Sequence, residues 1–531
     1  MPEANIIYEI VLLLLALPFL HETIWFENMF FQQNSYKAKR YLRSIKGANI
    51  ARYALHAGLL LSFFLLKMLP WALVVLGIGV FLLGIIRLRK KYKKPLALTA
   101  RVYRLWTAEV VIVGLLAVFL WQFCEASPFF ALLLYVCFAP LMVLFANALL
   151  VPLEASISRY YYNDAKRILQ NHKGLTIIGI TGSYGKTSTK HFLERMLSEK
   201  YNVLMTPGNF NTTLGVVITI RQHLKPYHDI FIVEMGAKQM GDIKEICALV
   251  NPSIGILTSV GEQHLETFKS IENIQQTKFE LIESLPTDGL AVLNTDYEYV
   301  RNKDLSSIRV KNILPYAMQE RALSYKHPLL LIDNIRFDAN AKAQFDIRCK
   351  QGEVADTFTT SLLGSYNLSN LLACYIVAKH LKCSSKELSK AIKDIHPVTH
   401  RLSVMHMQNG TTVLDDAYNS NPQGAEMALK VLAQYPGKKK MVITPGMVEL
   451  GEKQEEYNER LGKQIAEHTD YAFIVGQYNR ESLLKGIEKQ GYNKENIFAC
   501  ANLNEAVLRM NQIAKAGDVV LYENDLPDTF K

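Results

Sequence analysis

Residues 179–190 read "GITGSYGKTSTK" and directly follow the apolar run "LTII" at 175–178. Four residues of this stretch form the pattern G-x-x-G-K-T: Gly182, Gly185, Lys186 and Thr187. A glycine-rich turn between a strand and a helix binds phosphate through backbone N–H groups, and the lysine that follows neutralises phosphate charge. The longer general pattern has a glycine five residues before Gly185, where this chain has Ile180. The stretch nevertheless predicts a phosphate-binding turn, because a strand precedes it and a helix follows it.

Short apolar runs alternate with helical segments from Gly174 to about Asn302. Five runs are expected to be strands: 175–180, 202–206, 229–235, 253–260 and 289–294. Strands that alternate with helices build a doubly wound parallel sheet. We therefore expect an α/β core, followed by a stretch with strand-like alternation and then by two helices near 367–394.

A second α/β pattern begins near Arg401. Its expected strands are 411–416, 439–444, 471–476, 496–501 and 518–523. Helical segments separate these runs, so the pattern predicts a second, smaller Rossmann-like domain. Two α/β domains in succession favour a ligand cleft between them.

Long apolar segments dominate the first 150 residues. Five of them have the length of a membrane-spanning helix: 5–22, 51–68, 70–86, 106–124 and 129–150. The basic connections "YKAKRYLRSIKG" and "RLRKKYKK" follow the first and the third of these segments. Because positively charged loops stay in the cytoplasm, we expect the N-terminus outside and the chain after Val151 inside. These segments predict a multi-pass protein of the cytoplasmic membrane, with membrane lipid as a partner.

The net charge of +10 is concentrated in the same part of the chain. Residues 1–155 carry 15 Lys and Arg against 7 Asp and Glu, which leaves +2 for residues 156–531. The excess reflects membrane-flanking loops, so no nucleic-acid partner is expected. Seven cysteines without a C-x-x-C pair indicate thiols in a reducing compartment. The N-terminus has neither a basic leader nor a small-residue cleavage site, so no cleavable signal peptide is expected.

Two acidic residues, Glu9 and Glu109, fall within the predicted spans. Such acids can serve transport, but more often they lie near helix ends or face the protein interior. The helices are then either a simple anchor or a dock for a lipid-linked substrate, and both interpretations remain open at the level of sequence.

Three further residues follow strands of the first α/β pattern. Glu234 ends the third strand, where a carboxylate beside a phosphate loop is placed to hold Mg²⁺. His264 follows the next strand, and Lys278 lies on the helix after it. Taken one at a time, a surface glutamate, a structural histidine and a solvated lysine are equally good interpretations.

Taken in order, the motifs of the chain resemble those of the Mur ligases. The segments "TGSYGKT", "TPGNFNTTLG", "VEMGAKQMGDI", "GEQHLETF", "TKFELI" and "VLNTD" have the order and spacing of that family, whose phosphate loop is of the shorter form. Downstream, "LLGSYNLSNLLAC", "DDAYNSNP" and "GMVELGE" continue a resemblance that covers about residues 173–525. It is closest to the members that add D-alanyl-D-alanine to the muramyl peptide.

The resemblance implies an ATP-dependent ligase that forms a carbon–nitrogen bond. In the family, a carboxylate attacks the γ-phosphate of ATP to give ADP and an acyl phosphate, and an amine then displaces phosphate. The implied domains are a membrane domain at 1–155, a central ATP-binding domain at 156–398 and a C-terminal domain at 399–531. The implied partners are a carboxylate-bearing cell-wall precursor and an amino acid or dipeptide amine, in a bacterial-type cytoplasmic membrane.

The resemblance also implies roles for individual residues. The expected cofactor-binding residues are Gly182, Ser183, Gly185, Lys186, Thr187, Ser188, Asn294, Asp296, Arg401, Asp416, Tyr418 and Asn419. The expected catalytic residues are Lys186, Glu234, His264 and Lys278. Two Mg²⁺ ions are expected, one held by Thr187 and Glu234 and the second by His264 with Lys278. Lys278 is expected to be carbamylated, because an unmodified ammonium would repel the metal and a carbamate would support it.

The chain departs from the family pattern at three places. Membrane segments stand where the family has a domain that holds the UDP-muramyl part of the acceptor. Pro445 and Gly446 replace a Gly-Asp pair, and "VVLYENDLPDTFK" at 519–531 replaces a Lys-Gly-Ser-type loop. These changes concern the acceptor and the amine, so we expect an acceptor that is lipid-linked and embedded in the membrane.

Four alternative functions explain different shares of the motifs. A related acid–amino acid ligase that acts on a polyglutamate-like or other lipid-linked envelope precursor keeps every motif and is the nearest alternative. A nucleotide-binding scaffold would not need the four expected catalytic residues. An ATP-driven transporter would need coupling sequences and polar spans, and a P-loop kinase would not need the "DDAYNSNP" segment.

Overall fold

The computed structural model describes most of the chain in two compact units. The described residues are 3–48, 50–66, 70–90, 92, 95–124, 128–318, 330–337, 343–349, 353–418 and 420–526. The first unit is built on the residues up to Arg159 and the second on Tyr160–Leu526.

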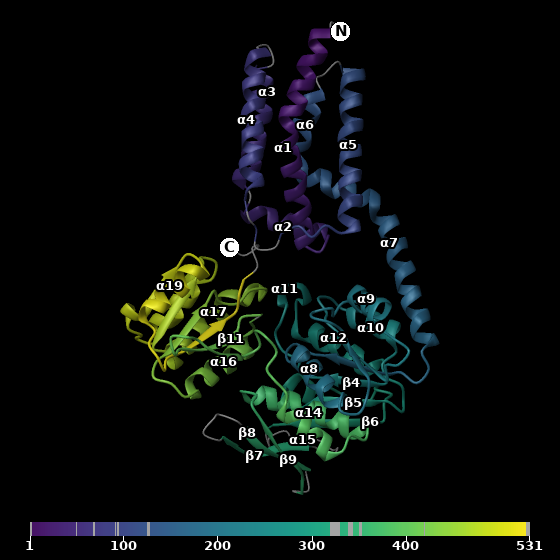
Figure 1. Cartoon of the computed structure of the whole chain (residues 1–531), viewed down its shortest axis with the longest axis vertical. Helices are drawn as coiled ribbons and strands as arrows, with labels where there is room; N and C mark the ends of the chain where they lie inside the picture. The colour runs from purple at the N-terminus through teal and green to yellow at the C-terminus, as the bar shows by residue number, and fades with distance from the viewer. Residues whose placement is uncertain are drawn as a thin grey trace. The chain divides into compact units, whose positions relative to one another are not determined.

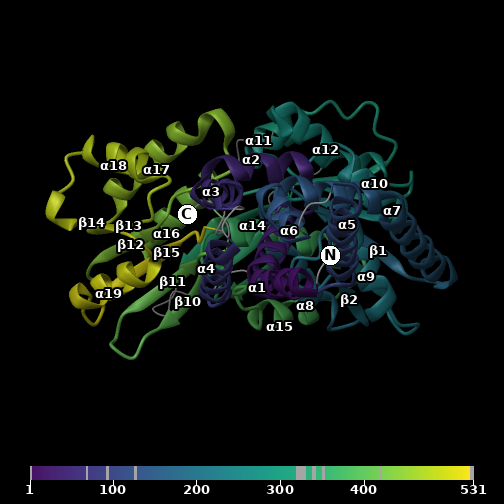
Figure 2. The same cartoon turned by 90° about the horizontal axis from the view of Figure 1, so that it is seen from above.

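The first unit is helical (Figure 1). Its helices are α1 (Glu3–Gln33), α2 (Ala38–Ala48), α3 (Ile50–Leu66), α4 (Pro70–Leu88), α5 (Ala100–Cys124) and α6 (Pro128–Cys137), and α7 (Ala139–Asn171) follows. The view along the helices shows α1 between α4 and α5, with α6 beside it (Figure 2). The centre of this unit is therefore the apolar helix α1.

Four helices among the described residues are long and apolar enough to cross a membrane. They are Ile10–Gln33, Trp71–Leu88, Ala100–Cys124 and Ala139–Asn171. Each overlaps one of the five spans expected from the sequence. The remaining span, at 51–68, coincides with α3, which has 17 residues and is followed by residues 67–69, outside the described residues.

The expected span at 129–150 is wrong in one respect, because two helices meet inside it. α6 ends at Cys137 and α7 begins at Ala139. Phe138 lies between the two helices, and Pro140 is the second residue of α7, where its missing N–H costs nothing. The apolar segment therefore forms a short helix followed by a long one that continues to Asn171.

The acid Glu109 of α5 faces the protein interior. Its carboxylate accepts a hydrogen bond from Asn28 Nδ2 at 2.8 Å and another from the Tyr135 hydroxyl. Glu109 is buried, which agrees with the expectation that an acid in these segments more often faces the protein interior. The side chain of Glu9 lies outside the described residues.

The larger sheet of the second unit has nine strands in the order β2-β3-β1-β4-β5-β6-β7-β8-β9. The strands are β1 (Thr176–Thr181), β2 (Val203–Met205), β3 (Ile230–Glu234), β4 (Ile254–Leu257), β5 (Leu290–Asn294), β6 (Asn312–Ala317), β7 (Leu330–Phe337), β8 (Ala343–Cys349) and β9 (Val354–Thr360). Pairing is parallel from β2 through β7 and antiparallel from β7 to β9.

Helices cover both faces of this sheet (Figure 1). α8 (Lys186–Leu197), α14 (Ser365–His380) and α15 (Ser385–Lys393) pack on one face, and α9 (Thr213–His223), α10 (Asp242–Val250) and α12 (Ile271–Glu283) pack on the other. The short helices α11 (Leu265–Phe268) and α13 (Glu298–Arg301) lie in connections. A strand covered on both faces is apolar throughout, as the "LTII" run before the phosphate loop is. The doubly wound fold expected from the sequence is confirmed.

The smaller sheet has six strands in the order β10-β11-β15-β12-β13-β14. The strands are β10 (Ser403–His406), β11 (Thr412–Asp416), β12 (Lys440–Thr444), β13 (Tyr471–Val475), β14 (Ile497–Cys500) and β15 (Val519–Glu523). The helices are α16 (Pro422–Gln434), α17 (Gln454–His468), α18 (Arg480–Glu488) and α19 (Leu503–Ile513), with short 3₁₀ turns at Gly451–Lys453 and Lys494–Asn496. Every strand but β10 was expected. β10 is an antiparallel edge strand with partly exposed residues, so it lacks the apolar run that marked the others.

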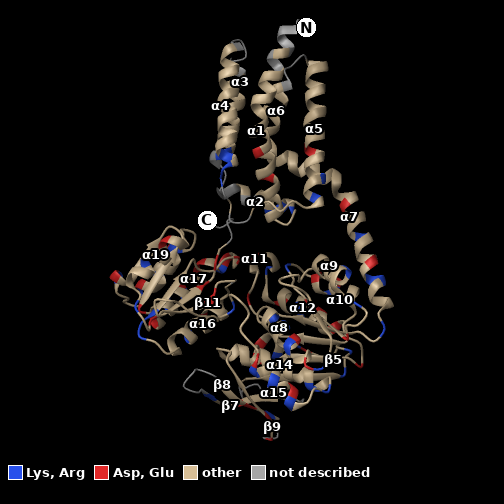
Figure 3. Cartoon of the chain, viewed as in Figure 1, with Lys and Arg blue, Asp and Glu red and all other residues tan. Residues whose placement is uncertain are grey.

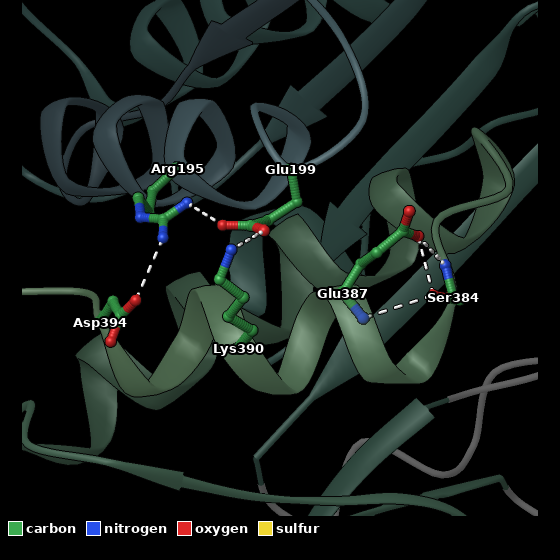
Figure 4. Close-up of polar contacts among 6 residues, drawn as sticks. All are labelled: Arg195, Glu199, Ser384, Glu387, Lys390 and Asp394. Atoms are coloured by element: carbon green, nitrogen blue, oxygen red, sulfur yellow. Dashed lines mark hydrogen bonds and ion pairs between the residues drawn. The ribbon is translucent and has the colours of Figure 1, made fainter.

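Ion pairs join α8 to α15, as Figure 4 shows. Arg195 Nη1 lies 2.5 Å from Glu199 Oε1, and Arg195 Nη2 lies 3.2 Å from Asp394 Oδ2. Lys390 Nζ lies 2.8 Å from the second oxygen of Glu199. Each pair contributes little alone, because it is partly exposed to solvent. Together they hold the C-terminal end of α8, the helix that follows the phosphate loop, against α15.

Helix α15 begins with a capping box (Figure 4). We expect Ser384→Ala to lower the free energy of unfolding by about 1 kcal/mol, because the Glu387 N–H loses the hydroxyl that accepts its hydrogen bond at 3.3 Å. Urea denaturation of the detergent-solubilised protein measures this change. Ser389→Ala is the matched control, since Ser389 is exposed in the same helix. Equal stability of the two variants would contradict the assignment of the cap.

Candidate active site

Gly182 and Gly185 give the phosphate loop its shape between β1 and α8. Their φ angles are +152° and +82°. A Cβ atom at Gly182 would lie 2.1 Å from Thr258 Oγ1, and one at Gly185 would lie 2.6 Å from Asn370 Oδ1. Backbone conformation and space therefore both require glycine at these positions.

The segment after β4 holds the phosphate loop in place. Ser183 N donates to Ser259 O at 3.0 Å, and Ser183 Oγ donates to Gly261 O at 2.9 Å. Tyr184 N donates to Ser259 Oγ at 2.6 Å. The N–H groups that remain for an anion are those of the first helical turn, residues 186–188, which have no partner within α8. Ser188 is buried, and its N–H group is one of these three.

The amine of Lys186 folds over the loop. Its Nζ donates to Gly182 O at 2.6 Å and to Ser183 O at 3.2 Å. Burial lowers the pKa of Lys186 to about 8, while Glu234 opposes this shift and Arg401 adds to it. The lysine lies beside the first turn of α8, where its charge would neutralise a phosphate held by these N–H groups.

We expect the affinity of the protein for ATP to fall as the pH rises through about 8. Lys186 pairs with phosphate when it is protonated, and at a pH equal to its pKa half of the amines are neutral. Below that pH the charge is present and the affinity keeps its full value. Titration calorimetry over a pH series measures the profile, and Lys186→Arg, whose charge does not titrate, should flatten it. A constant affinity well above pH 8 in the unmodified protein would contradict this assignment.

Glu234 lies at the end of β3, beside the first turn of α8. Its Oε1 accepts hydrogen bonds from Thr187 Oγ1 and Asn211 Nδ2, both at 3.2 Å. Its Oε2 lies 3.1 Å from Lys190 Nζ, and both of these side chains are buried. Burial alone would raise the pKa of Glu234, but the charges of Lys190 and Lys186 hold this pKa below its usual value. The carboxylate is therefore ionised and, with Thr187, presents the oxygen ligands that Mg²⁺ prefers.

His264 lies after β4 and contacts Glu449 from the loop after β12. The two residues have left-handed φ angles of 55° and 64°, and His264 Nδ1 is hydrogen-bonded to Glu449 Oε2. Lys453 Nζ and Glu262 Oε1, 2.8 Å apart, join the same two segments. Burial lowers the pKa of His264, against the opposing effect of Glu449. A neutral imidazole with its proton on Nδ1 leaves Nε2 as a lone-pair donor.

Lys278 extends from α12 into the interior. The residue is 3% exposed, and no hydrogen bond or ion pair reaches its amine from the part of the chain that the structure describes. Burial, together with the charge of Lys186, holds the pKa of Lys278 well below its usual value. An unpaired ammonium is costly at such a site, so burial favours the neutral form of this amine.

A cavity of about 580 Å³ lies beside the phosphate loop. Its walls come from residues 184 and 260–262, from residues 296–301 after β5, and from α16 and α17. The aromatic rings of Tyr184 and Tyr297 line it, with centroids 6.3 Å apart. Aromatic walls with a few polar groups are typical of a site for a small organic ligand.

Asn294 and Asp296 follow β5, and they differ in their relation to this cavity. Asp296 lines it, and its carboxylate accepts a hydrogen bond from Met318 N at 2.9 Å. Asn294 is buried, donates to Ser369 Oγ at 3.1 Å and accepts from Asp296 N at 3.1 Å. Asn294 therefore positions the Asp296 backbone, whereas Asp296 faces the cavity.

Arg401, Asp416 and Tyr418 come from the region of the smaller sheet. The guanidinium carbon of Arg401 lies 4.3 Å from the centroid of the Tyr418 ring. Asp416 ends β11 and accepts a hydrogen bond from Leu402 N at 3.1 Å, and burial raises its pKa to about 6, against the opposing charge of Arg401. The positive charge of Arg401 also lowers the pKa of Lys186, so the two side chains interact electrostatically. Asn419 lies outside the described residues.

The donor sets for the two expected metal ions differ. Thr187 and Glu234 fit one Mg²⁺ because both present oxygen atoms at the same place. Within the described ranges, no group of three His, Cys, Asp or Glu residues is arranged to hold a metal. His264 and an unmodified Lys278 supply two nitrogen atoms, which suit Mg²⁺ poorly. A carboxylate on Lys278 would supply the oxygen ligands that a second Mg²⁺ prefers.

Three residues of the site were not assigned from the sequence. Lys190 pairs with Glu234, and it lies four residues after Lys186 on the same helix face, a spacing that could have identified it. Asn211 and Glu449 stand inside the quoted segments "TPGNFNTTLG" and "GMVELGE". Their contacts with Glu234 and His264 join segments far apart in the chain, so sequence spacing alone carries no signal for them.

Comparisons with known proteins place this fold and these motifs in one family. Two family models match in chain order: the Mur ligase middle domain over residues 180–378, and the Mur ligase, glutamate ligase domain over residues 400–522. Together they cover more than half of the chain.

Similar proteins include two named UDP-N-acetylmuramoyl-tripeptide–D-alanyl-D-alanine ligase. The protein from Bacillus subtilis is 26% identical over 365 residues, which are 68% of this chain and 75% of that protein. The protein from Mycobacterium tuberculosis is 31% identical over 308 residues, 57% of this chain and 58% of that protein. The chain therefore spans a little over half of the mycobacterial relative.

Two solved structures are similar to the second unit. The MurF ligase from Thermotoga maritima in complex with ADP is 26% identical, with a TM-score of 0.58, over 69% of this chain and 80% of that one. MurF from Acinetobacter baumannii, at 23% identity and a TM-score of 0.61 over 70% and 78%, shows the fold. With the two matched models in chain order and the same fold, the chain belongs to the Mur ligase family of ATP-dependent acid–amino acid ligases.

Proposed function

We propose that this protein joins the carboxylate of a lipid-linked muramyl-peptide precursor to an amine, with D-alanyl-D-alanine as the first candidate amine. As a Mur ligase, the chain is an amide-bond ligase of peptidoglycan precursor synthesis. The observation that carries the ligase chemistry is the set of charged and polar side chains at the phosphate loop, Lys186, Thr187 and Glu234. The lipid-linked acceptor is inferred from the apolar helices of the first unit. A scaffold that only binds nucleotide has no use for the buried Lys278 and Glu234.

The first step of the proposed reaction is phosphoryl transfer. The acceptor carboxylate attacks the γ-phosphorus of ATP, an acyl phosphate forms, and ADP leaves. The N–H groups of residues 186–188 and the amine of Lys186 hold the β- and γ-phosphates, while the cavity lined by Tyr184 and Asp296 receives the nucleoside. The similarity to a MurF ligase in complex with ADP supports the binding of an adenine nucleotide by this fold.

Thr187 and Glu234 would hold one Mg²⁺, and His264 Nε2 with a carbamate on Lys278 would hold a second. When bound, the metal ions neutralise charge on the transferring phosphoryl group. The carbamate forms when the neutral Lys278 amine adds to CO₂: a nitrogen–carbon bond forms and a proton is released. The low pKa and the unpaired amine of Lys278 support this modification.

The second step joins the amine to the acyl carbon. The incoming amine attacks the acyl phosphate, an amide forms, and inorganic phosphate and a proton leave. Arg401, from the region of the smaller sheet, interacts electrostatically with Lys186. Closure of this region over the phosphate loop would keep out water that hydrolyses the acyl phosphate. The reaction thus needs both α/β regions of the second unit.

One contact favours a second candidate function, with a different amine or envelope precursor. Gly446 and the segment that contains Glu523 and Asn524 are the two C-terminal departures from the family. They meet in the structure, where Asn524 Nδ2 donates to Gly446 O at 2.6 Å. Both departures therefore lie at one place, which favours a changed binding site for the amine. The alternative is a related acid–amino acid ligase that acts on another lipid-linked or polyglutamate-like envelope precursor.

The membrane part of the proposal rests on the apolar helices and the basic loops. Four described helices are long enough to span. We infer a multi-pass protein of the bacterial cytoplasmic membrane, with the N-terminus outside and the ligase domains, at 156–398 and 399–531, inside. On that side the site has access to ATP and to a lipid-linked acceptor.

Product formation with two acceptors tests this proposal. The purified full-length protein receives ATP, Mg²⁺ and D-alanyl-D-alanine, with either the soluble UDP-linked peptide or the polyprenyl-linked form. We expect amide product with the polyprenyl-linked acceptor. Equal turnover of the soluble acceptor would contradict a lipid-linked substrate, and product with a different amine alone would support the alternative ligase.

A further inference from the structure

An arginine-rich cluster lies where α1, α3 and α4 of the first unit meet. Arg52 donates to both carboxylate oxygens of Glu22, from Nη1 at 3.0 Å and from Nη2 at 2.7 Å. Arg87 Nη1 lies 3.2 Å from His56 Nε2, and its nearest contact with Glu22 is 3.9 Å. The side chains of Glu22, Arg52 and Arg87 are 2%, 11% and 20% exposed. We call Glu22, Arg52, His56 and Arg87 the arginine cluster.

Close helix packing brings the arginine cluster together. Gly84 of α4 lies against Phe19 of α1, and a Cβ atom at Gly84 would be 2.5 Å from Phe19 N. Arg87 follows Gly84 by three residues, and Glu22 follows Phe19 by three, so both lie almost one turn further along. The Arg87 guanidinium carbon lies 5.2 Å from the centroid of the Phe19 ring. Arg87 is therefore held in the helix interface.

The arginine cluster has hydrogen-bond donors to spare. Arg52 Nε is buried and has no hydrogen-bond partner in the part of the chain that the structure describes. The Arg52 guanidinium carbon lies 3.9 Å from the Phe26 ring centroid, so its planar fork is fixed in orientation. Arg87 has no carboxylate oxygen nearer than 3.9 Å among the described residues. Buried guanidinium groups with unused donors favour the binding of an anion.

The other described acids near this end of the helices already have partners. Glu27 accepts hydrogen bonds from the hydroxyl groups of Tyr41 and Tyr53, the latter at 3.1 Å. Glu154 accepts from Arg104, at 2.6 Å and 3.0 Å. No further described carboxylate near this end of the helices is therefore left to pair with Arg87.

The arginine cluster lies at the charged end of the first unit. Figure 3 shows the basic residues at the end of the helices away from the N-terminus. Arg52 lies near the start of α3 and Arg87 near the end of α4, and Arg101 and Arg104 lie near the start of α5. Basic residues at the ends of apolar helices lie at the level of the lipid headgroups. The cluster is therefore placed at the depth where lipid phosphate groups lie.

We propose that the arginine cluster binds the phosphate groups of the lipid-linked acceptor. The proposal rests on the function proposed above, in which the acceptor is lipid-linked, and it assigns the helices a binding role beyond anchoring. Phosphate oxygens accept hydrogen bonds from the N–H groups of the part-exposed Arg87, and Arg52, which is paired with Glu22, adds positive charge beside them. A guanidinium binds phosphate through two parallel hydrogen bonds, which a diffuse attraction to membrane lipid does not provide.

A binding measurement without ATP or amine tests this site. Full-length protein in phosphatidylcholine nanodiscs is titrated with a polyprenyl diphosphate and with the polyprenol of the same chain length, and bound lipid is measured by native mass spectrometry. We expect the diphosphate to bind at least about tenfold more tightly than the alcohol, and Arg87→Gln to remove most of this difference. Arg89→Gln is the matched control, since Arg89 is exposed two residues further along and loses the same charge.

Three outcomes would overturn the proposal. They are equal binding of the diphosphate and the alcohol, equal losses in Arg87→Gln and Arg89→Gln, and competition by inorganic diphosphate as strong as that by the lipid. Arg87→Lys, which keeps the charge, should retain part of the affinity, and this separates phosphate recognition from a folding defect. This experiment measures lipid binding and no ligase turnover. A failure of the proposed reaction would therefore not change the binding result, and a failure to bind the diphosphate would not exclude the proposed reaction.

Discussion

Replacing Lys186 with alanine should lower ligase turnover at least about a hundredfold and leave the fold intact. The Lys186 amine lies over the phosphate loop, where its charge stabilises the phosphoryl group as it is transferred. In the proposed site the remaining Lys190 cannot replace it, because Lys190 is paired with Glu234 and donates to Gly208 O at 2.7 Å. Phosphate release with saturating ATP, acceptor and amine measures the loss.

The control for this variant is Lys200→Ala. Lys200 lies just beyond the other end of α8 and is exposed, so its removal changes the net charge equally and leaves the site unchanged. We expect its turnover to stay within about twofold of the unmodified protein. Comparable turnover of Lys186→Ala and Lys200→Ala would remove Lys186 from the phosphate site.

Replacing Lys278 with alanine should also lower turnover at least about a hundredfold, and small carboxylates such as acetate or propionate should restore part of it. The truncation leaves space next to His264, and a carboxylate that enters it replaces the carbamate. The unmodified protein should lose activity when CO₂ and bicarbonate are removed and regain it when bicarbonate returns. Turnover in a bicarbonate series measures both effects.

Two further variants separate this chemistry from packing. Lys278→Met fills the same space without an amine, and burying a thioether in place of an unpaired amine should not destabilise the protein. It should therefore fold normally and stay inactive with added carboxylate. Lys244→Ala, at an exposed position of α10, should respond to bicarbonate as the unmodified protein does. Full activity of Lys278→Ala without any carboxylate would rule out a role for the carbamate.

The elements that could be predicted from sequence are those that long apolar runs define. The strands around the phosphate loop are buried on both faces, so their residues are apolar without interruption. The edge strand β10 has no such run, and one apolar segment is divided into α6 and α7 although no polar residue separates the two helices. Periodicity reveals burial and is blind to an interruption inside an apolar segment.

The site was predictable to the extent that its residues stand in local motifs. Gly182, Gly185 and Lys186 form one turn, so their spacing alone indicates phosphate binding. The partners of Glu234 and His264 could not be read in this way, because Asn211 and Glu449 reach them from distant segments. The arginine cluster was likewise hidden, since Glu22, Arg52 and Arg87 meet only when three helices pack.

ATP turnover in the presence and absence of each co-substrate tests the central claim most directly. Detergent-purified protein receives ATP and Mg²⁺ with the polyprenyl-linked acceptor alone, with the amine alone, and with both. An amide ligase should release ADP and phosphate continuously with both co-substrates and form one amide for each ATP consumed. Phosphate release that is the same without acceptor or amine, with no amide product, would contradict the account.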